Sequence, residues 1–509
     1  MSFNEYSDFE NELTTSDGEF DGEFSDLDDP PVIVQSFNSK SSYDHLADKF
    51  IDFTNQNPTT FHTISYFKTL LESQGFQSIP ESKPLTPQVK NDLKLNGGLY
   101  YSVRSDLSLV AFVIGAEWKP ENGVGIIGSH VDALTAKLKP ISVKSDHDGY
   151  QLLGVAPYSG TLNKLWLDRD LGIGGKVIVK DQKTGRVSSR FVKSAHPIAK
   201  IPSIAEHFID FEQQKYNKET GMVPIIGFTE KDDTSDVTDS EKASPLYGKH
   251  SIHLLRYISK LSSTPISHIL QLDLELYDVQ AATRGGLSNE FIFAPRVDDR
   301  LCSFAAIYSL IQVSKSVGDL TSYGGFQLVN LVDNEEIGSA TRTGVRGKFM
   351  NSTIDRVLYA RNLPAATSRQ VYANSFILSA DVTHALNPNF ASAYLKDHAP
   401  LPNVGLTIKQ NANWKNMTDS TGLDVMRRIA KKNKLTLQTF HIKNGEPSGG
   451  TIGPMISCDT GSRTVDVGLS QLSMHSIRAM FGYKEVGIGV ETFSAFFKDW
   501  QEIYKEYDA

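Results

Sequence analysis

The chain has 509 residues, of which 39% are hydrophobic, and this length and apolar content predict two or three domains with a large buried core. Only two cysteines occur, Cys302 and Cys458, which excludes a disulfide framework and a cysteine-based zinc knuckle. No stretch approaches the roughly 18–20 consecutive apolar residues of a membrane helix, so we expect no membrane insertion. The N-terminus is acidic rather than basic, so we also expect no secretory signal peptide and synthesis in the cytosol.

The formal charge of −9 belongs to the N-terminal end of the chain. Residues 1–30 contain eleven of the 60 acidic residues and none of the 51 basic ones, so the remainder carries 51 basic against 49 acidic residues. A nearly neutral body lacks the basic surface that binds DNA or RNA, and we expect no nucleic acid partner. The acidic tract of residues 1–42 has neither a helical nor a strand period, which predicts disorder. Its scattered phenylalanines leave a short docking motif as the alternative to a solvated tail.

Order is predicted to begin near Tyr43. Thr60 can cap a helix that ends at Gly75 and that carries apolar residues at helical spacing along one face. Strand-like runs follow this helix, each of them apolar and bounded by turn residues. These runs cover residues 98–103, 107–115 and 123–128.

Residues 135–286 differ from the rest of the chain in their pattern of predicted strands and turns. Short β-type runs, such as 174–180 and 186–192, alternate there with turns rich in Gly, Pro and Lys. This pattern indicates a β-rich domain inserted into a larger domain made of residues 43–134 and 287–509.

The larger domain alternates strands with helices, which is typical of an α/β sheet covered by helices on both faces. Its buried strands are expected at residues 291–294, 326–332, 376–380 and 465–469. We therefore predict an α/β fold with a central mixed sheet, helices on both of its faces, and the inserted β-rich domain.

Polar side chains follow several of these predicted strands. Taken singly, each has an ordinary structural explanation: an Asp before a helix caps it, and a Glu pair is usually solvated. Taken together they gather at the strand ends, where open α/β sheets place their ligand sites. The residues at these ends are His130, Asp132, Asp298, Asp299, Asp333, Glu335, Glu336, Asp381 and His475.

A cluster of carboxylates at one sheet edge repels itself strongly unless cations neutralise it. Imidazole and carboxylate ligands without thiolate suit zinc, or a harder ion such as manganese. Two such ions bridged by one carboxylate would make a two-metal hydrolase. In an extended segment His130 and Asp132 share a face, so His130 can bind a metal while Asp132 orients its ring. Of Glu335 and Glu336, one can bind a metal and the other can act as general base, and the spacing alone does not decide which.

Six segments of the chain resemble motifs of one family of zinc aminopeptidases, which includes vacuolar aminopeptidase I and aspartyl aminopeptidase. The resemblance runs in order from about Asp44 to the C-terminus and is strongest to the vacuolar members. The matching segments are GSHVDA (128–133), APRVDDRL (294–301), VDNEEIGS (332–339), SADVTH (379–384), SGGTIGP (448–454) and QLSMHSIR (471–478).

The resemblance implies a peptidase that removes N-terminal residues from peptides with two zinc ions. His130, Asp298 and Asp381 match the ligands of one metal, with Asp298 as the bridge, and Glu336 and His475 match the ligands of the other. Glu335 matches the general base, and Asp132 matches the catalytic aspartate behind His130. The family combines an α/β catalytic domain with an inserted dimerisation domain and assembles as dodecamers. His207 resembles a histidine that reaches the active site of a neighbouring subunit, although a surface-loop histidine is the simpler interpretation.

Two features leave specificity and location open. Lys409 resembles a substrate-contacting lysine of aspartyl aminopeptidase and could pair with an acidic first residue, whereas an exposed strand-end lysine is the alternative. His384 is expected to line the same pocket, and a neutral or hydrophobic first residue is the main expectation. Residues 1–42 lack the amphipathic helical propeptide of the vacuolar enzyme. We expect delivery from the cytoplasm to the vacuole, with a selective-autophagy receptor as a possible partner of this tail, and a cytoplasmic location as the alternative.

Two other functions compete with this hypothesis. A non-catalytic assembly or cargo protein would be expected to have lost a ligand or the base, and no matched position is altered. A carboxypeptidase or deacylase needs a basic group to hold a substrate carboxylate, and Lys409 could serve that purpose.

Overall fold

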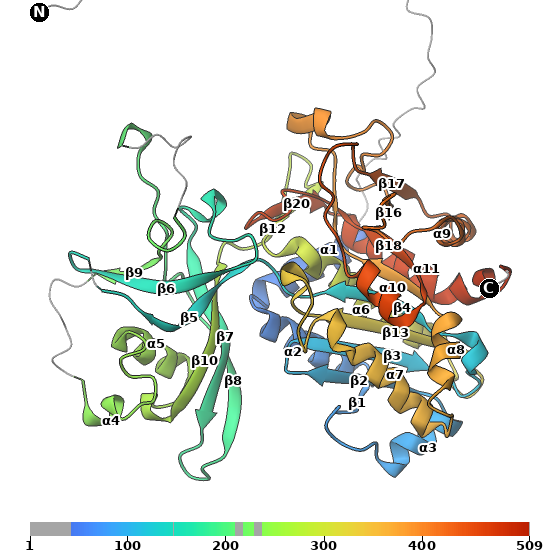
Figure 1. Cartoon of the computed structure of the whole chain (residues 1–509), viewed down its shortest axis with the longest axis horizontal. Coiled ribbons are helices and arrows are strands. Elements are labelled where there is room, and N and C mark those ends of the chain that lie inside the picture. The colour runs from blue at the N-terminus through green and yellow to red at the C-terminus, as the bar shows by residue number, and fades with distance from the viewer. Residues whose placement is uncertain (1–41, 146, 209–216, 229–236, 508–509) are drawn as a thin grey trace, which may run out of the picture. The chain divides into compact units, whose positions relative to one another are not determined.

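The computed structural model describes residues 42–145, 147–208, 217–228 and 237–507. The predicted acidic tail therefore lies, except for its last residue, outside the described residues. The strands of the described part form three sheets, of nine, six and five strands (Figure 1). Within these residues, none of the helices combines the length and the apolar composition needed to cross a bilayer.

The nine-stranded sheet holds the strand ends that carry the candidate site. Its order is β1-β2-β3-β13-β4-β14-β18-β16-β17, and the central strands β13, β4, β14 and β18 are parallel to one another. Their carboxyl ends therefore lie along one edge. The strands are β1 (Gln77–Ser78), β2 (Gly98–Arg104), β3 (Ser108–Ile114), β4 (Gly125–His130), β13 (Phe326–Val332), β14 (Phe376–Ala380), β16 (Leu406–Gln410), β17 (Leu437–His441) and β18 (Arg463–Gly468).

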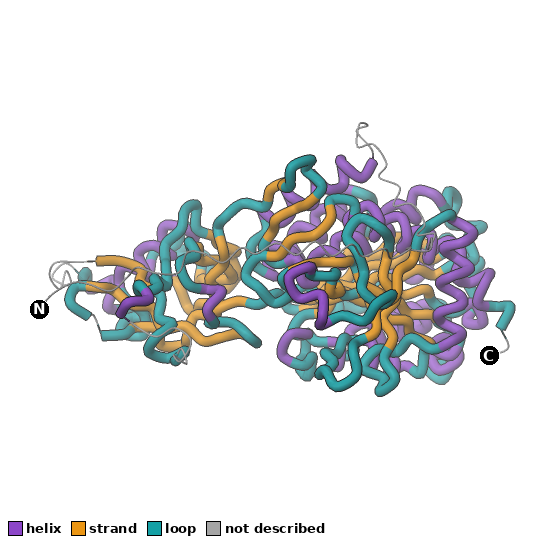
Figure 2. Tube along the Cα trace, turned by 90° about the horizontal axis from the view of Figure 1, so that it is seen from above, coloured by secondary structure: helices purple, strands orange, loops and turns teal. Residues whose placement is uncertain are grey.

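Both faces of this sheet are buried under helices, as Figure 2 shows. Ile126 of β4 packs into one core and the next residue, Ile127, into the other, as expected for side chains that alternate along a strand. This arrangement confirms the predicted α/β class with helices on both faces. One face carries α1 (Ser42–Gln56), α2 (Thr60–Ser73), α6 (Val297–Ser316), α9 (Ser420–Asn433) and α11 (Glu485–Tyr504); the other carries α3 (Pro87–Leu95), α7 (Phe349–Ala360), α8 (Thr367–Ala373) and α10 (Gly453–Thr460).

The six-stranded sheet is built within the predicted insert. Its order is β8-β7-β10-β5-β6-β9, every pairing is antiparallel, and α5 (Ile252–Ser262) packs against it through Leu254, Leu255 and Ile258. The short helix α4 (Asp239–Lys242) lies in the same stretch of chain. That this region is a separate domain for dimerisation remains a prediction. The strands are β5 (Thr135–Val143), β6 (Tyr150–Tyr158), β7 (Leu171–Lys180), β8 (Val187–Lys193), β9 (Ile225–Phe228) and β10 (Ile269–Asp278).

The five-stranded sheet was not foreseen. Phe291–Ala294, which the sequence suggests as a strand of the large sheet, is β12 of this small sheet, because it pairs in antiparallel fashion with β20 near the C-terminus. β11, from within the predicted insert, pairs with its other edge. The remaining strands of this sheet are β11 (Thr283–Gly285), β15 (Thr383–His384), β19 (Ser470–Leu472) and β20 (Ala479–Gly482).

Candidate metal centre

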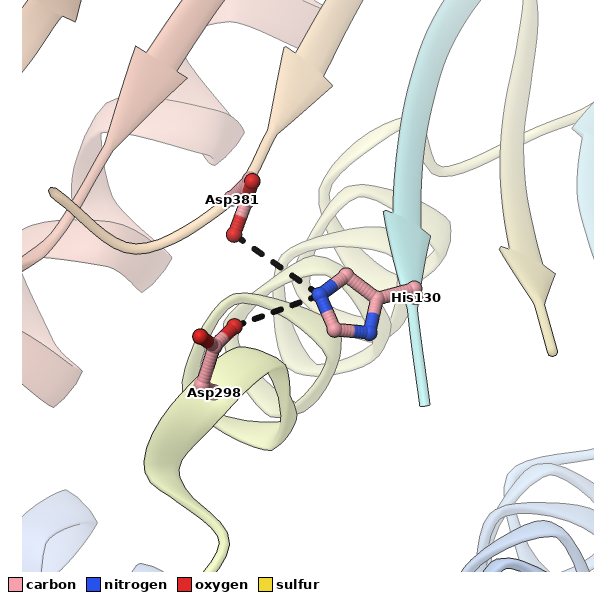
Figure 3. A group of neighbouring side chains, drawn as sticks. All are labelled: His130, Asp298 and Asp381. Atoms are coloured by element: carbon pink, nitrogen blue, oxygen red, sulfur yellow. Dashed lines mark ion pairs between the residues drawn. The ribbon is translucent and has the colours of Figure 1, made fainter. Parts of the chain in front are cut away.

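A first group of potential ligands lies at the carboxyl edge of the nine-stranded sheet. His130 is the last residue of β4, and Asp381 directly follows the neighbouring parallel strand β14. His130 Nε2 lies 3.2 Å from Asp298 Oδ1 and 3.8 Å from Asp381 Oδ1 (Figure 3). One donor atom from each of these residues lies within 4.8 Å of the others, which is a spacing that one metal ion can span.

Asp298 reaches this group from the beginning of α6 rather than from a strand of the large sheet. Asp298 and Asp299 both have non-helical backbone angles, so their side chains diverge. Asp299 is fully buried, where it accepts hydrogen bonds from Ser129 Oγ at 2.6 Å and from the Val382 N–H at 3.1 Å. Burial first, and then the charge of Asp381, raise the pKa of Asp299 well above its usual value. Asp298 is thus left to face the site, and Asp299 ties the ends of β4 and β14 together.

A second group shares Asp298. Its other oxygen, Oδ2, lies 3.5 Å from His475 Nε2, and the same nitrogen lies 3.9 Å from Glu336 Oε2. Glu336 lies in the 3₁₀ turn η5 (Glu335–Ile337) after β13, and His475 lies in the loop between β19 and β20. The two oxygens of Asp298 therefore face two different histidines, as in a carboxylate that bridges two ions.

The charges of both groups fit a cationic occupant. Burial, and then the charge of Asp298, raise the pKa of Glu336 to about 9, and burial is also the main reason that the pKa of Glu335 rises to about 7. Glu336 Oε1 is buried without a hydrogen-bond partner in the described part of the chain. A zinc site typically brings together carboxylates and imidazoles whose charge and unpaired oxygens the ions balance. The two groups have this composition.

Asp132 connects the two groups. Its Oδ1 lies 3.3 Å from His130 Nδ1 and accepts the Glu335 N–H at 3.2 Å, while its Oδ2 accepts the Glu336 N–H at 3.2 Å and the Tyr158 hydroxyl at 2.8 Å. Burial opposes its charge, but His130 and these donors outweigh burial and lower the pKa of Asp132. Asp132 is therefore placed to orient both the His130 ring and the turn that carries Glu335 and Glu336.

Lys409 is buried, with 6% of its surface exposed, so the exposed-lysine interpretation is wrong. Its ammonium donates to the Val382 carbonyl at 2.9 Å and lies 3.7 Å from Asp381 Oδ2. Burial opposes the charge of Asp381, but Lys409 and then His130 outweigh it and lower the pKa of Asp381 to about 2. The lysine thus acts on the first group through Asp381.

The two remaining candidates lie outside both groups. His384 ends β15, beside Gln471 of β19, which leads into the loop of His475. His207 lies in the 3₁₀ turn η3 (Glu206–Phe208), is exposed, and has its ring 4.5 Å from that of Phe208. Sequence reasoning missed Tyr158, because only the folded chain brings the end of β6 next to Asp132.

The model of the family described as Aminopeptidase I zinc metalloprotease (M18) matches residues 53–497. The chain belongs to this family. The relationship predicted from the motifs is thereby confirmed, and with it the assignment as a zinc aminopeptidase.

Individual relatives of this M18 chain cover nearly its whole length. Vacuolar aminopeptidase 1 of Saccharomyces cerevisiae is 47% identical over 92% of this chain and 90% of its own. Aspartyl aminopeptidase of Aspergillus oryzae is 35% identical over 90% of this chain and 96% of its own. The solved S. cerevisiae mApe1 dodecamer superposes with a TM-score of 0.82 at 44% identity, over 92% of this chain and 99% of that one.

Proposed function

We propose that this M18 aminopeptidase removes N-terminal residues from peptides with two zinc ions per subunit. His130, Asp298 and Asp381 would hold the first ion, and Asp298, Glu336 and His475 the second. The observation that carries the proposal is that the two oxygens of Asp298 face different histidines. Oδ1 lies 3.2 Å from His130 Nε2, and Oδ2 lies 3.5 Å from His475 Nε2. Zinc ions in such a site supply Lewis acidity toward the scissile carbonyl and toward water.

Glu335 is the general base in this proposal. Its Oε2 lies 3.9 Å from His130 Nε2, so the carboxylate borders the first ion site, where it can take a proton from the attacking water and return it to the departing amine. Its backbone N–H is bonded to Asp132, which also contacts His130 Nδ1. Asp132 thus keeps the base and the first metal ligand in a fixed relation.

We further propose a preference for neutral or hydrophobic N-terminal residues. The chain is more similar to a relative named vacuolar aminopeptidase 1, at 47% identity, than to one named aspartyl aminopeptidase, at 35%. The ammonium of Lys409 is already engaged by the Val382 carbonyl and by Asp381, which leaves it poorly placed to read an acidic side chain. An acidic preference is the second candidate, because a cation does lie beside the site and a relative is named an aspartyl aminopeptidase. His384 is proposed to line the pocket for the first residue.

For the assembly, we propose a homo-oligomer, most simply a dodecamer, since a relative at 44% identity is described as one. The exposure of His207 suits a residue that enters a neighbouring subunit's site. We propose the vacuole as the final location, reached from the cytoplasm, by analogy with the relative named for it. Contact of the tail with an autophagy receptor concerns residues outside the described part of the chain.

The experiment compares purified wild-type protein with the Glu335→Gln variant on Leu-, Asp- and Glu-anilides, with and without a chelator. We expect Leu-anilide to be cleaved fastest, chelator to abolish cleavage, and an N-terminally blocked substrate to resist. Glu335→Gln should lose roughly 10²–10⁴-fold in turnover and still bind zinc. Exposed Glu117→Gln is the matched control and should resemble the wild type. Full activity of Glu335→Gln would contradict the role of Glu335, and cleavage of the blocked substrate would favour a different hydrolase.

A further inference from the structure

Tyr158 joins the six-stranded sheet to the centre of the proposed active site. It is the last residue of β6, it is half-buried, and its hydroxyl donates to Asp132 Oδ2 at 2.8 Å. The same hydroxyl accepts a hydrogen bond from Asn334 Nδ2 at 2.9 Å. Among the described residues, it is the one donor to the Asp132 side chain that comes from the six-stranded sheet.

We propose that Tyr158 is a positioning residue of the aminopeptidase reaction, which acts through Asp132 and makes catalysis depend on the six-stranded sheet. The inference rests on the proposed roles of Asp132 and His130. It extends them, because it places part of the catalytic framework in the inserted region, which the sequence assigned to assembly alone.

The bonds of Asp132 explain why one hydroxyl matters. Each of its two oxygens has two polar neighbours: Oδ1 has His130 Nδ1 and the Glu335 N–H, and Oδ2 has the Glu336 N–H and the Tyr158 hydroxyl. Hydrogen bonds to a carboxylate are stronger than those between neutral groups. Without Tyr158, Oδ2 would keep only the backbone donor, and the carboxylate would be freer to rotate away from His130.

Tyr158 is itself held from two sides. The ammonium of Lys137, on the adjacent strand β5, lies 5.6 Å from the centre of its ring and is paired with Glu275 of β10. On the other side, Asn334 Oδ1 accepts hydrogen bonds from the hydroxyls of Thr341 at 2.8 Å and Thr343 at 3.0 Å. The hydroxyl is therefore fixed between the sheet and the turn that carries the glutamates, which is the requirement for a positioning group.

The Tyr158→Phe variant tests this role, because it removes the hydroxyl and keeps the ring that packs beside Lys137. Partners that orient metal ligands are typically worth 10–100-fold in metal affinity or activity. We expect kcat on Leu-anilide to fall roughly tenfold with KM changed less than about twofold, since Tyr158 acts on orientation and not on substrate binding. Zinc affinity, measured by chelator competition, should fall as well, while the thermal unfolding midpoint stays close to that of the wild type.

Tyr150→Phe is the matched control, since Tyr150 begins the same strand, is exposed, and lies far along β6 from Asp132. It should match the wild type in kcat, KM and zinc affinity. A Tyr158→Phe enzyme with wild-type kcat and zinc affinity would overturn the inference.

A double-mutant cycle with Asp132→Asn tests whether Tyr158 acts through Asp132. In the Asp132→Asn background, Tyr158→Phe should have little further effect, because the two residues work as one unit. An undiminished loss in that background would overturn the inference. A wild-type protein without aminopeptidase activity would instead refute the proposed function, so the two failures are distinguishable.

Discussion

The two candidate metal-binding groups share Asp298 but differ in how the fold holds their histidines. His130 ends β4, which pairs with a parallel strand on each side, and its side chain is 2% exposed. His475 lies in a loop, and its side chain is 62% exposed. His475 also has a positive φ of 60°, which an L-residue seldom adopts. The first group therefore belongs to the core of the sheet, and the second is completed by a loop on its surface.

The two groups also differ in the charged residues that surround them. Lys409 lies 3.7 Å from Asp381 of the first group, and Asp132 Oδ1 lies 3.3 Å from His130 Nδ1 of the same group. Glu336 of the second group keeps a raised pKa of about 9, caused first by burial and next by Asp298. A preformed, charge-balanced group should bind its ion more tightly than one that depends on an exposed loop.

Removal of the two histidines gives the largest expected effects. His130→Ala should lower kcat/KM by more than about 10²-fold, since even residues that only orient a ligand are worth up to that much. It should also destabilise the protein, because it leaves Asp298 and Asp381 near an empty buried space. His475→Ala should leave one zinc ion per subunit bound and the unfolding midpoint nearly unchanged, with a smaller loss of activity.

Exposed His45→Ala serves as the control for these variants. Activity assays, zinc content and thermal unfolding of the three proteins measure the contrast. If His475→Ala were as destabilising as His130→Ala, or lost both ions, the two groups would not differ as described.

Lys409→Met is expected to have a smaller effect, on the first group alone. Without the ammonium 3.7 Å from its Oδ2, Asp381 would be less firmly oriented, and zinc affinity at that group should fall about tenfold. The ratio of Leu- to Asp-anilide cleavage should stay constant, as it should in the exposed control Lys498→Met. A selective loss of Asp-anilide cleavage with zinc affinity intact would show instead that Lys409 reads an acidic substrate.

The smallest expected effect is a pH dependence of stability in metal-free protein. Burial raises the pKa of Glu335 to about 7 and that of Glu336 to about 9, from ordinary values of 4.5, so the folded chain binds more protons than the unfolded chain between these limits. The stability that these two groups contribute is therefore fully present below about pH 4.5 and is lost as the pH rises through about 7 and 9. Denaturant unfolding at pH 5, 7 and 9 measures this fall, which saturating zinc should abolish. Rising stability over this range without metal would contradict it.

Much of this site was predictable from strand ends and motifs. His130 ends β4, and Glu336 and Asp381 follow its parallel neighbours β13 and β14, so the edge that these strands share brings the three residues together. The sequence did not show that Asp298 faces the site while Asp299 is buried, because this depends on non-helical backbone angles at the beginning of α6.

Other features depend on contacts between distant segments. The alternation of short β-type runs and turns indicated a β-rich region at 135–286. It did not reveal that the Tyr158 hydroxyl donates a hydrogen bond to Asp132. The pairing of β12 with β20 joins distant parts of the chain, such as Phe291 and Gly482, and no local sequence pattern indicates it. Lys409 lies on β16, which pairs with β18, and is buried beside Asp381, whereas the sequence left a substrate-contacting and an exposed lysine as alternatives.

Zinc content during graded chelation tests the central claim most directly. Fully loaded protein should hold two zinc ions per subunit and lose them in two steps, the first from the group of exposed His475 and the second from the group of buried His130. In His475→Ala the first step should be missing and the second unchanged. A single step that removes both ions together, or a loaded protein with one ion per subunit, would contradict the account.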